Sequence, residues 1–444
     1  MDREDTTAKR ERRKNTWRSE HRARAHDSAH ADPNLAEQTE IPEELQRVSR
    51  AAALVVADDP SLLRLIEDLR ASGRFAYDSE FIGELTYFPK LCLIQVASES
   101  QVALIDPLAD IDLRPFWELL ADAQVEKIVH AGEQDLEPVN RHMGKLAANV
   151  VDTQIAAAFI GLPYPLKLSK LVWETTKVKL GKGLTFSHWD QRPLSTIQLR
   201  YAADDVRYLP AMWAELERRL KASGHLAWAK EESESLCQTS VYQFDPQTNY
   251  SRIRGATGLP PRNLAVLREL TILRDDAARK LDVPPRTFLR DEVLLELARN
   301  PVRAVDKLAR VRGLPRPVEH DYGALIIERT AHAMALPVAA LPPSLKAPDP
   351  SPPEKFRSDA LFAAGQSLCA GMGMDPALVA SRAEFDYLYQ YLTGSRREPT
   401  PLLLQGWRKQ AVGDPLTALL SGTATLSLSW EENSLRARRE SAGD

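Results

Sequence analysis

Two acidic residues, Asp78 and Glu80, stand two positions apart in the segment FAYDSEF. If this segment is a β-strand, both side chains project from one face, because successive side chains alternate between the faces. Acidic residues are uncommon in strands, and two like charges on one face repel each other. A cation between them relieves that repulsion, and oxygen ligands favour Mg²⁺ or Mn²⁺. On this pattern alone, a solvated face of a half-exposed strand stays open as the alternative.

Three further residues could join this pair. Asp135 follows the strand-like segment KIVHAG and is expected in the first turn of a helix, where α/β sheets build sites. Tyr201 and Asp205 are four positions apart in LRYAADDVRYL, so they share one helix face, whereas Asp204 points elsewhere. Each also has an ordinary explanation. Asp135 suits the positive end of a helix, Tyr201 suits a core, and Asp205 suits a surface beside arginines.

The elements around these residues predict an α/β domain over 50–230. Near residue 50 we expect a strand and then a helix that Asp58 or Asp59 caps. Three strands follow one another, and then helices and strands alternate, which favours a mixed sheet with helices on its faces. From 152 to about 235 the pattern is helical, and it includes one long helix over 194–224.

The remainder of the chain is predicted to be helical or unstructured. Helical patterns cover 258–336 and 355–428, and a Pro-rich linker at 340–354 separates them. The polar segment at 1–45 is expected to be disordered, either as an inert tail or as an arm that touches RNA. Residues 429–444 are also expected to be disordered.

Composition narrows the class of protein. A chain of 444 residues suggests two to four domains. The net charge of −4 excludes binding of a polyanion by bulk charge, so nucleic-acid affinity would need local basic patches. The three cysteines are far apart, without metal or redox spacing, which fits a reducing cytoplasm. No apolar run is long enough to span a bilayer, so we expect a cytoplasmic protein without a membrane partner.

Together these blocks resemble a known pattern. The chain resembles the DEDD 3′→5′ exonucleases of the tyrosine subclass, with DSE as the first motif, HAGEQDLEPV as the second and YAADD as the third. The flanking segments TYFPKLCLIQVAS, VDTQIAAAFIG and HWDQRPLSTIQLRYAADDVRYL are similar to the ribonuclease D family. The resemblance runs from about residue 53 to 225 and implies a ribonuclease H-like α/β fold.

The resemblance also implies a reaction. Two divalent ions, Mg²⁺ or Mn²⁺, would serve phosphodiester hydrolysis, with Asp78 bridging both ions. Glu80 and Asp205 would complete the site that activates water, Asp135 would hold the second ion, and Tyr201 would orient the water. The expected partner is RNA with a free 3′ end, notably a tRNA precursor, from which the enzyme releases 5′-mononucleotides. We expect it to act as a monomer.

Several aromatic and polar residues are candidates for substrate binding. Phe81, Tyr87 and Phe88 follow the first motif and could stack on terminal bases, although core packing explains them equally well. His130 is better explained as structural than as catalytic, but it stays a candidate contact. Trp189 and Arg192 precede the third motif and could line a substrate channel.

The helical segment at 258–336 resembles the HRDC domain, a small bundle that often binds nucleic acid. Its long first helix, its VPP turn and its short DEVLLELAR helix carry the resemblance. Six arginines are candidates for phosphate contacts, with ordinary surface arginine as the alternative. They are Arg262, Arg268, Arg286, Arg290, Arg310 and Arg312. The segment at 355–428 resembles the second helical domain of ribonuclease D.

Two other functions compete with this prediction. A DNA exonuclease would use the same chemistry, but no helicase or polymerase segment accompanies these motifs, and this favours RNA. A catalytically inactive RNA-binding scaffold would not need the four acids and the tyrosine together.

Overall fold

The structure is a computed structural model that describes residues 52–83, 85–181, 188–238, 242, 244–345, 351–431 and 434–441. The expected arm at 1–45 lies outside the described residues, as does part of the Pro-rich linker. Within these ranges, no helix is both long enough and apolar enough to cross a membrane.

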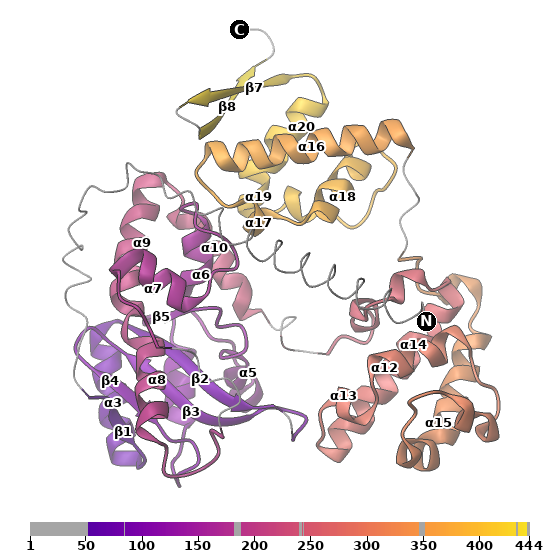
Figure 1. Ribbon diagram of the computed structural model, residues 1–444, viewed down its shortest axis with the longest axis horizontal. Helices are drawn as coiled ribbons and strands as arrows, with labels where there is room; N and C mark the ends of the chain where they lie inside the picture. The colour runs from indigo at the N-terminus through magenta and orange to yellow at the C-terminus, as the bar shows by residue number, and fades with distance from the viewer. Residues whose placement is uncertain are drawn as a thin grey trace, which may run out of the picture. The chain divides into compact units, whose positions relative to one another are not determined.

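A mixed six-stranded sheet forms the centre of the first domain (Figure 1). Its strand order is β1-β4-β3-β2-β5-β6. Strand β3 pairs antiparallel with both β2 and β4, and the other pairings are parallel. The strands are β1 (Leu54–Val56), β2 (Arg74–Ile82), β3 (Lys90–Ala97), β4 (Val102–Ile105), β5 (Glu126–Val129) and β6 (Val150–Asp152).

Helices cover both faces of this sheet. On one face, α3 (Asp59–Ser72) and α4 (Arg114–Leu120) pack with residues of β2 and β3 such as Tyr77 and Val96. On the other face lies α8 (Thr196–Arg207), whose Ala202 packs with Leu93 and Leu104 (Figure 1). The predicted mixed sheet with flanking helices is therefore confirmed. The helix cap is confirmed as well, because the side chain of Asp58 accepts a hydrogen bond from the N–H of Ser61 at 2.9 Å.

The prediction of one long helix over 194–224 is wrong. The segment forms two helices, α8 and α9 (Leu209–Ser223), which meet at Tyr208. Pro210 explains the break, since proline has no N–H to donate and its ring clashes with the preceding helical turn. Strand β6 is a second difference from the sequence analysis. Its three residues are buried and carry no alternating pattern.

The remaining helices of this domain pack beside the sheet. The second motif runs from the end of β5 into the first turn of α5 (Glu137–Met143), and α6 (Thr153–Ala158) follows β6 directly. The domain also contains α7 (Leu168–Thr176) and α10 (Leu226–Glu234). The side chain of Asp152 caps α6, because it accepts a hydrogen bond from the N–H of Gln154 at 2.7 Å.

The segment predicted as helical over 258–336 forms its own hydrophobic core around α12 (Pro261–Leu281), α14 (Asp291–Arg299) and α15 (Arg316–Ala335). The short helix α13 (Pro285–Phe288) follows the VPP turn. The segment PVRAVDKLARV, which has a helical pattern, contains a 3₁₀ helix at Val305–Arg310.

The C-terminal helices share one hydrophobic cluster with the first domain, and the ring of Trp407 lies 4.7 Å from that of Phe159. They are α16 (Pro352–Gly371), α17 (Pro376–Val379), α18 (Arg382–Leu392), α19 (Gly406–Arg408) and α20 (Asp414–Leu420).

The tail predicted to be disordered at 429–444 is instead largely a hairpin, with β7 at Ala424–Glu431 and β8 at Ser434–Ser441. That prediction was wrong because Leu426, Leu428 and Trp430 alternate with small polar residues, which is a strand pattern.

Candidate active site

Strand β2 positions the first two acids. It lies between β3 and β5, and Asp78 and Glu80 stand opposite Gln95 and Leu93 of β3. Opposite residues of an antiparallel pair project from the same face. Because Leu93 packs against α8, both acids lie on the face that α8 covers, and both are partly buried. The alternative of a solvated strand face is therefore wrong.

Helix α8 brings Tyr201 and Asp205 to that face. The helix begins at a capping box, in which the Ser195 side chain bonds the N–H of Gln198 and the Gln198 side chain bonds the N–H of Ser195. Its buried alanines pack on the sheet, so the backbone of α8 comes close to β2 and β3. The Tyr201 hydroxyl hydrogen-bonds the Asp205 carboxylate one turn away. The predicted shared face of these two residues is confirmed.

Asp135 lies in the turn before α5 rather than in the helix itself, and only 8% of it is exposed. Two residues on the opposite face of β2 hold this turn. The Ser79 hydroxyl donates to the Asp135 carboxylate at 2.5 Å, and the Tyr77 hydroxyl donates to the backbone carbonyl of Asp135 at 2.7 Å. The first and second motifs are thus joined through β2.

A glycine makes the turn after β5 possible. A Cβ atom at Gly132 would lie 2.5 Å from the Cβ of Val129, which is closer than any real contact of this kind. The Gly132 N–H also donates to the buried carboxylate of Asp152 at 3.1 Å. A larger residue at this position would push the turn, and Asp135 with it, away from β2.

All four carboxyl groups have raised pKa values, and burial is the largest cause in each. Burial raises the pKa of Asp78 well above its usual range, and the charges of Asp135, Asp205 and Glu80 raise it further. Burial, with the charges of Asp205 and Asp135, raises the pKa of Glu80 to about 8. Burial also raises the pKa of Asp205 to about 7 and that of Asp135 to about 6. Without a bound cation, ionisation of carboxyl groups that are buried close to other acids is unfavourable.

Comparison with known proteins places the chain in a family. Residues 54–221 match the 3′-5′ exonuclease family, and residues 263–329 match the HRDC domain. The chain is 37% identical to ribonuclease D of Gluconacetobacter diazotrophicus over 392 residues, covering 86% of this chain and 98% of that protein. The chain belongs to the ribonuclease D family.

Other members agree with this assignment. Ribonuclease D of Pseudomonas paraeruginosa is 36% identical over 365 residues, which cover 81% of this chain and 96% of that protein. The crystal structure of Escherichia coli RNase D superposes with a TM-score of 0.74 at 30% identity, covering 84% of this chain and 99% of that one. As a ribonuclease D family member, this protein is a 3′→5′ exoribonuclease, and its family implies the use of a divalent metal.

In this ribonuclease D family member, Trp189 and Arg192 contact residues around the third motif and hold the segment that precedes it. Trp189 is 4% exposed, and its ring lies 6.2 Å from that of Tyr201. The Arg192 guanidinium donates to both carboxylate oxygens of Asp106 at 2.6 Å and to the carbonyl of Cys92 at 2.7 Å. These contacts fix the segment before α8, so we assign neither residue to substrate binding.

His130 is also held by the protein. One ring nitrogen lies 2.9 Å from the Thr153 hydroxyl, and the other lies 2.9 Å from the carbonyl of Leu166. Burial lowers the pKa of His130 below its usual value. These contacts support the structural interpretation, and we do not propose a substrate contact for it.

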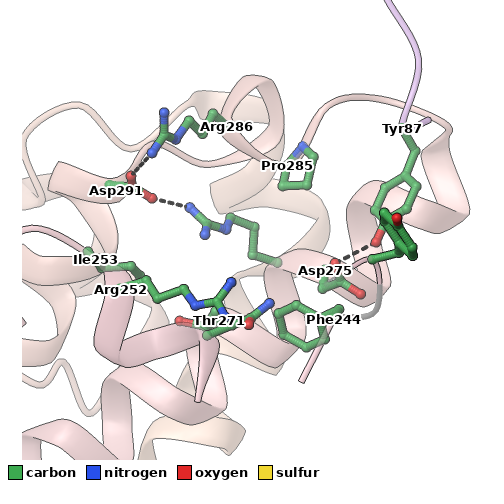
Figure 2. Close-up of a pocket in the computed structure, with 12 residues that line it drawn as sticks. Tyr87, Phe244, Arg252, Ile253, Thr271, Asp275, Pro285, Arg286 and Asp291 are labelled. Carbon is green, nitrogen blue, oxygen red and sulfur yellow. Dashed lines mark hydrogen bonds and ion pairs between the residues drawn. The ribbon is translucent and has the colours of Figure 1, made fainter. Parts of the chain in front are cut away.

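Tyr87 and Phe88 have contacts that the sequence analysis did not anticipate. The Tyr87 hydroxyl donates to Asp275 of α12 at 2.7 Å (Figure 2). The Arg279 guanidinium lies 4.7 Å from the centre of the Tyr87 ring. The Phe88 ring lies edge-on to that of Tyr87 at 4.8 Å, and the Arg141 guanidinium lies 5.0 Å from its centre. Both rings are therefore packing residues, and Phe81 alone of the three is kept for the proposal.

A pocket of about 350 Å³ lies beside Tyr87, with Arg252, Arg274 and Arg286 in its wall (Figure 2). Asp291 accepts ion pairs from Arg274 at 2.5 Å and from Arg286 at 2.9 Å. Arg274 and Arg286 thus share one carboxylate, whose single charge balances only one of them.

The predicted phosphate contacts fall into two groups. Arg262 donates to the carbonyl groups of Met334 and Leu336, and Arg268 donates to Gln247 at 3.3 Å. These two arginines, like Arg286, bond to the protein itself. Arg290, Arg310 and Arg312 are exposed and stay candidates.

Sequence reasoning missed Tyr77, Ser79 and Gln95. Tyr77 and Ser79 belong to the face of β2 opposite to the acids, so a search for acids on one face passes over them. Gln95 could have been noticed in the sequence, because it is the single polar residue between Leu93 and Ala97 in an otherwise apolar segment. It is completely buried, and among the described residues neither its amide nitrogen nor its amide oxygen has a hydrogen-bond partner.

Proposed function

We propose that Asp78, Glu80, Asp135 and Asp205 hold two divalent ions, Mg²⁺ or Mn²⁺, for the hydrolysis of RNA from its 3′ end. The main support is that four acids from three separate segments lie buried or partly buried with raised pKa values, and that the charges of the neighbouring acids add to the rise at Asp78 and Glu80. A fold gains no stability from gathering ionised carboxylates in a partly buried place. Bound cations would offset the repulsion among the carboxylates, which explains why the fold brings them together.

The four donors suit such ions chemically, although their side chains would have to move to bind them. All four donors are carboxylates, which are the ligands that hard divalent cations prefer. In the part of the chain that the structure describes, no three acidic, histidine or cysteine side chains are already grouped as ligands of one ion. Binding would therefore require rotations that bring the carboxylate oxygens together.

Ions bound there would neutralise charge on the phosphate, lower the pKa of water and stabilise the leaving oxygen. The protein would contribute the placement of the carboxylate ligands around the ions. Asp78 lies centrally, since the charges of Asp135, Asp205 and Glu80 all act on it, and this suits a bridging ligand. Glu80 and Asp205 would bind on the side nearer α8. Asp135, fixed by Ser79, would bind on the other side.

Tyr201 would position the attacking water rather than remove its proton. Burial and the charges of Asp205, Glu80 and Asp78 raise the pKa of Tyr201 above its usual range. The hydroxyl therefore keeps its proton at physiological pH and can donate or accept a hydrogen bond. The Trp189 ring behind it restricts the ring orientation.

The substrate that we propose is RNA with a free 3′ end, with tRNA precursors as the natural class and 5′-mononucleotides as products. The related E. coli RNase D is described as an exoribonuclease involved in structured RNA processing. The HRDC match and the exposed Arg290, Arg310 and Arg312 support contacts with the body of such an RNA. Phe81 could stack on the terminal base.

A substrate panel tests this proposal. The purified protein is given tRNA with a short 3′ extension, the same tRNA with a 3′-phosphate, and single-stranded DNA with the extension sequence. We expect 5′-mononucleotides from the first RNA, little product from the blocked RNA and slower cleavage of DNA. Equal rates on DNA, or products that accumulate from internal cuts, would reject the substrate assignment.

A further inference from the structure

Gln95 is a buried side chain whose place in the sheet connects it with the proposed metal site. It lies on β3 directly opposite Asp78 of β2. Side chains in this relation have Cβ atoms about 4.5–5.5 Å apart and stand on the same face. The side chain of glutamine is long enough to bring its amide to the Asp78 carboxylate.

The other neighbours of Gln95 offer it no hydrogen bond. Leu104 stands opposite it on β4, and Leu93 and Ala97 flank it along β3 on the same face. Ala202 and Ala203 of α8 pack over these apolar residues. Of its neighbours in the sheet on this face, Asp78 is therefore the polar one.

The amide of Gln95 is also cut off from bulk water. None of the residue is exposed, and among the described residues neither its donor nor its acceptor atom has a partner. Buried amides in folded proteins are nearly always hydrogen-bonded, so an isolated one points to a partner acquired in another state. A buried water would itself need two or more polar partners, and Asp78 would again be one of them.

We propose that Gln95 is a positioning residue for Asp78, and that its amide N–H donates to the Asp78 carboxylate when that carboxylate turns to bind the divalent ion. The inference rests on the proposed metal site. The hydrogen bond uses one lone pair of the carboxylate and fixes the plane of the group, so that the remaining oxygen lone pairs face the ion. Groups behind metal ligands commonly act in this way.

The experiment measures Mn²⁺ binding by titration calorimetry on the full-length protein without RNA. Gln95→Met keeps the length of the side chain and removes both polar atoms, and Gln95→Leu is a second variant in case the first does not fold. Gln101→Met is the matched control, because Gln101 lies in the turn after β3 and its amide donates to Asp68 at 3.3 Å. Thermal unfolding in chelator reports on the fold of each variant.

For both Gln95 variants we expect a Kd for Mn²⁺ at least about 10-fold higher than that of the wild type. The Gln101→Met control should bind as the wild type does. Stability in chelator should not fall for Gln95→Met, since the variant loses no hydrogen bond. In exonuclease assays, half-saturation by Mn²⁺ should rise, and kcat at saturating Mn²⁺ should recover most of its value.

Two results would overturn the inference. Wild-type affinity for Mn²⁺ in a folded Gln95→Met or Gln95→Leu variant would make Gln95 a packing residue. A loss of stability in chelator with unchanged affinity would have the same meaning. The metal site itself is tested separately with Asp78→Asn. If Asp78→Asn binds Mn²⁺ as tightly as the wild type, the proposed function fails, whatever the Gln95 variants do.

Discussion

Replacing Glu80 by glutamine should stabilise the metal-free protein at alkaline pH. Burial and the neighbouring carboxylates raise the pKa of Glu80 from 4.5 to about 8. The folded protein therefore keeps a proton that the unfolded chain has lost between these two pH values. Stability from this proton is fully present below the lower value and is lost as the pH rises through the higher one. Glutamine is neutral at every pH, so the variant lacks this loss.

The size of the effect follows from the pKa. At about 1.4 kcal/mol per pKa unit, the rise from 4.5 to about 8 means that the ionised Glu80 costs about 5 kcal/mol above pH 8. Partial exposure to solvent reduces this to about 2–3 kcal/mol. For a domain of this size, such a difference raises Tm by about 5–10 °C. At pH 5 the wild type and Glu80→Gln should unfold at nearly the same temperature.

Differential scanning calorimetry in chelator at pH 5, 7 and 8.5 measures this difference. Glu118→Gln on α4 is the matched control, because Glu118 is exposed and should show no pH-dependent change. Added Mg²⁺ should reverse the order at pH 8.5, since the wild type binds the ion more tightly than the variant. Equal melting temperatures of wild type and Glu80→Gln at pH 8.5 in chelator would refute the described burial of Glu80 among the other acids.

Three further predictions concern the same site. Mg²⁺ affinity should rise from pH 6 to pH 8 with release of protons, because acids with raised pKa values must ionise to bind the ion; calorimetry in buffers of different ionisation enthalpy would show no buffer dependence if this is wrong. Tyr201→Phe should lower kcat by roughly 10²-fold with little change in KM, a milder defect than that of Asp205→Ala, and an unchanged kcat would remove Tyr201 from the reaction. Arg192→Ala should lower stability by about 1–3 kcal/mol through loss of its bonds to Asp106 and Cys92 while Mn²⁺ affinity is kept; a weakened affinity at full folding would contradict its structural role.

Much of the site could be predicted from local spacing. The alternation of a strand places Asp78 and Glu80 on one face, and the helical repeat places Tyr201 and Asp205 together, so both pairs follow from geometry within one element. The meeting of these elements could not be derived in that way. It depends on the order of strands in the sheet and on the small residues of α8 that allow close packing. Only the family pattern linked the motifs beforehand.

The residues that sequence reasoning missed or misjudged act through tertiary contacts. Ser79 and Tyr77 matter because the turn carrying Asp135 comes back to β2 from more than fifty residues away. Tyr87 and Phe88 resemble exposed stacking residues in the sequence, but α12 supplies partners for Tyr87. Gln95 is recognisable only once its opposite residue on β2 is known.

The errors in secondary structure have local causes. Pro210 interrupts the helix, although the repeat of apolar residues continues through this position and predicts no break. The C-terminal hairpin was missed, although Leu426, Leu428 and Trp430 of its first strand alternate with small polar residues. The alternation of apolar and polar residues was the better guide to the structure of this segment.

The most direct test of the central claim compares two adjacent aspartates. Asp205 belongs to the proposed metal site, whereas the neighbouring Asp204 pairs with Arg207 at 3.2 Å. Release of 5′-mononucleotides from 3′-extended tRNA is measured for the wild type, Asp78→Ala, Asp205→Ala and Asp204→Ala, with Mg²⁺ and with chelator. We expect activity only with Mg²⁺, its loss in Asp78→Ala and Asp205→Ala, and near wild-type rates in Asp204→Ala. Activity that persists in chelator, or in folded Asp78→Ala, would contradict the account.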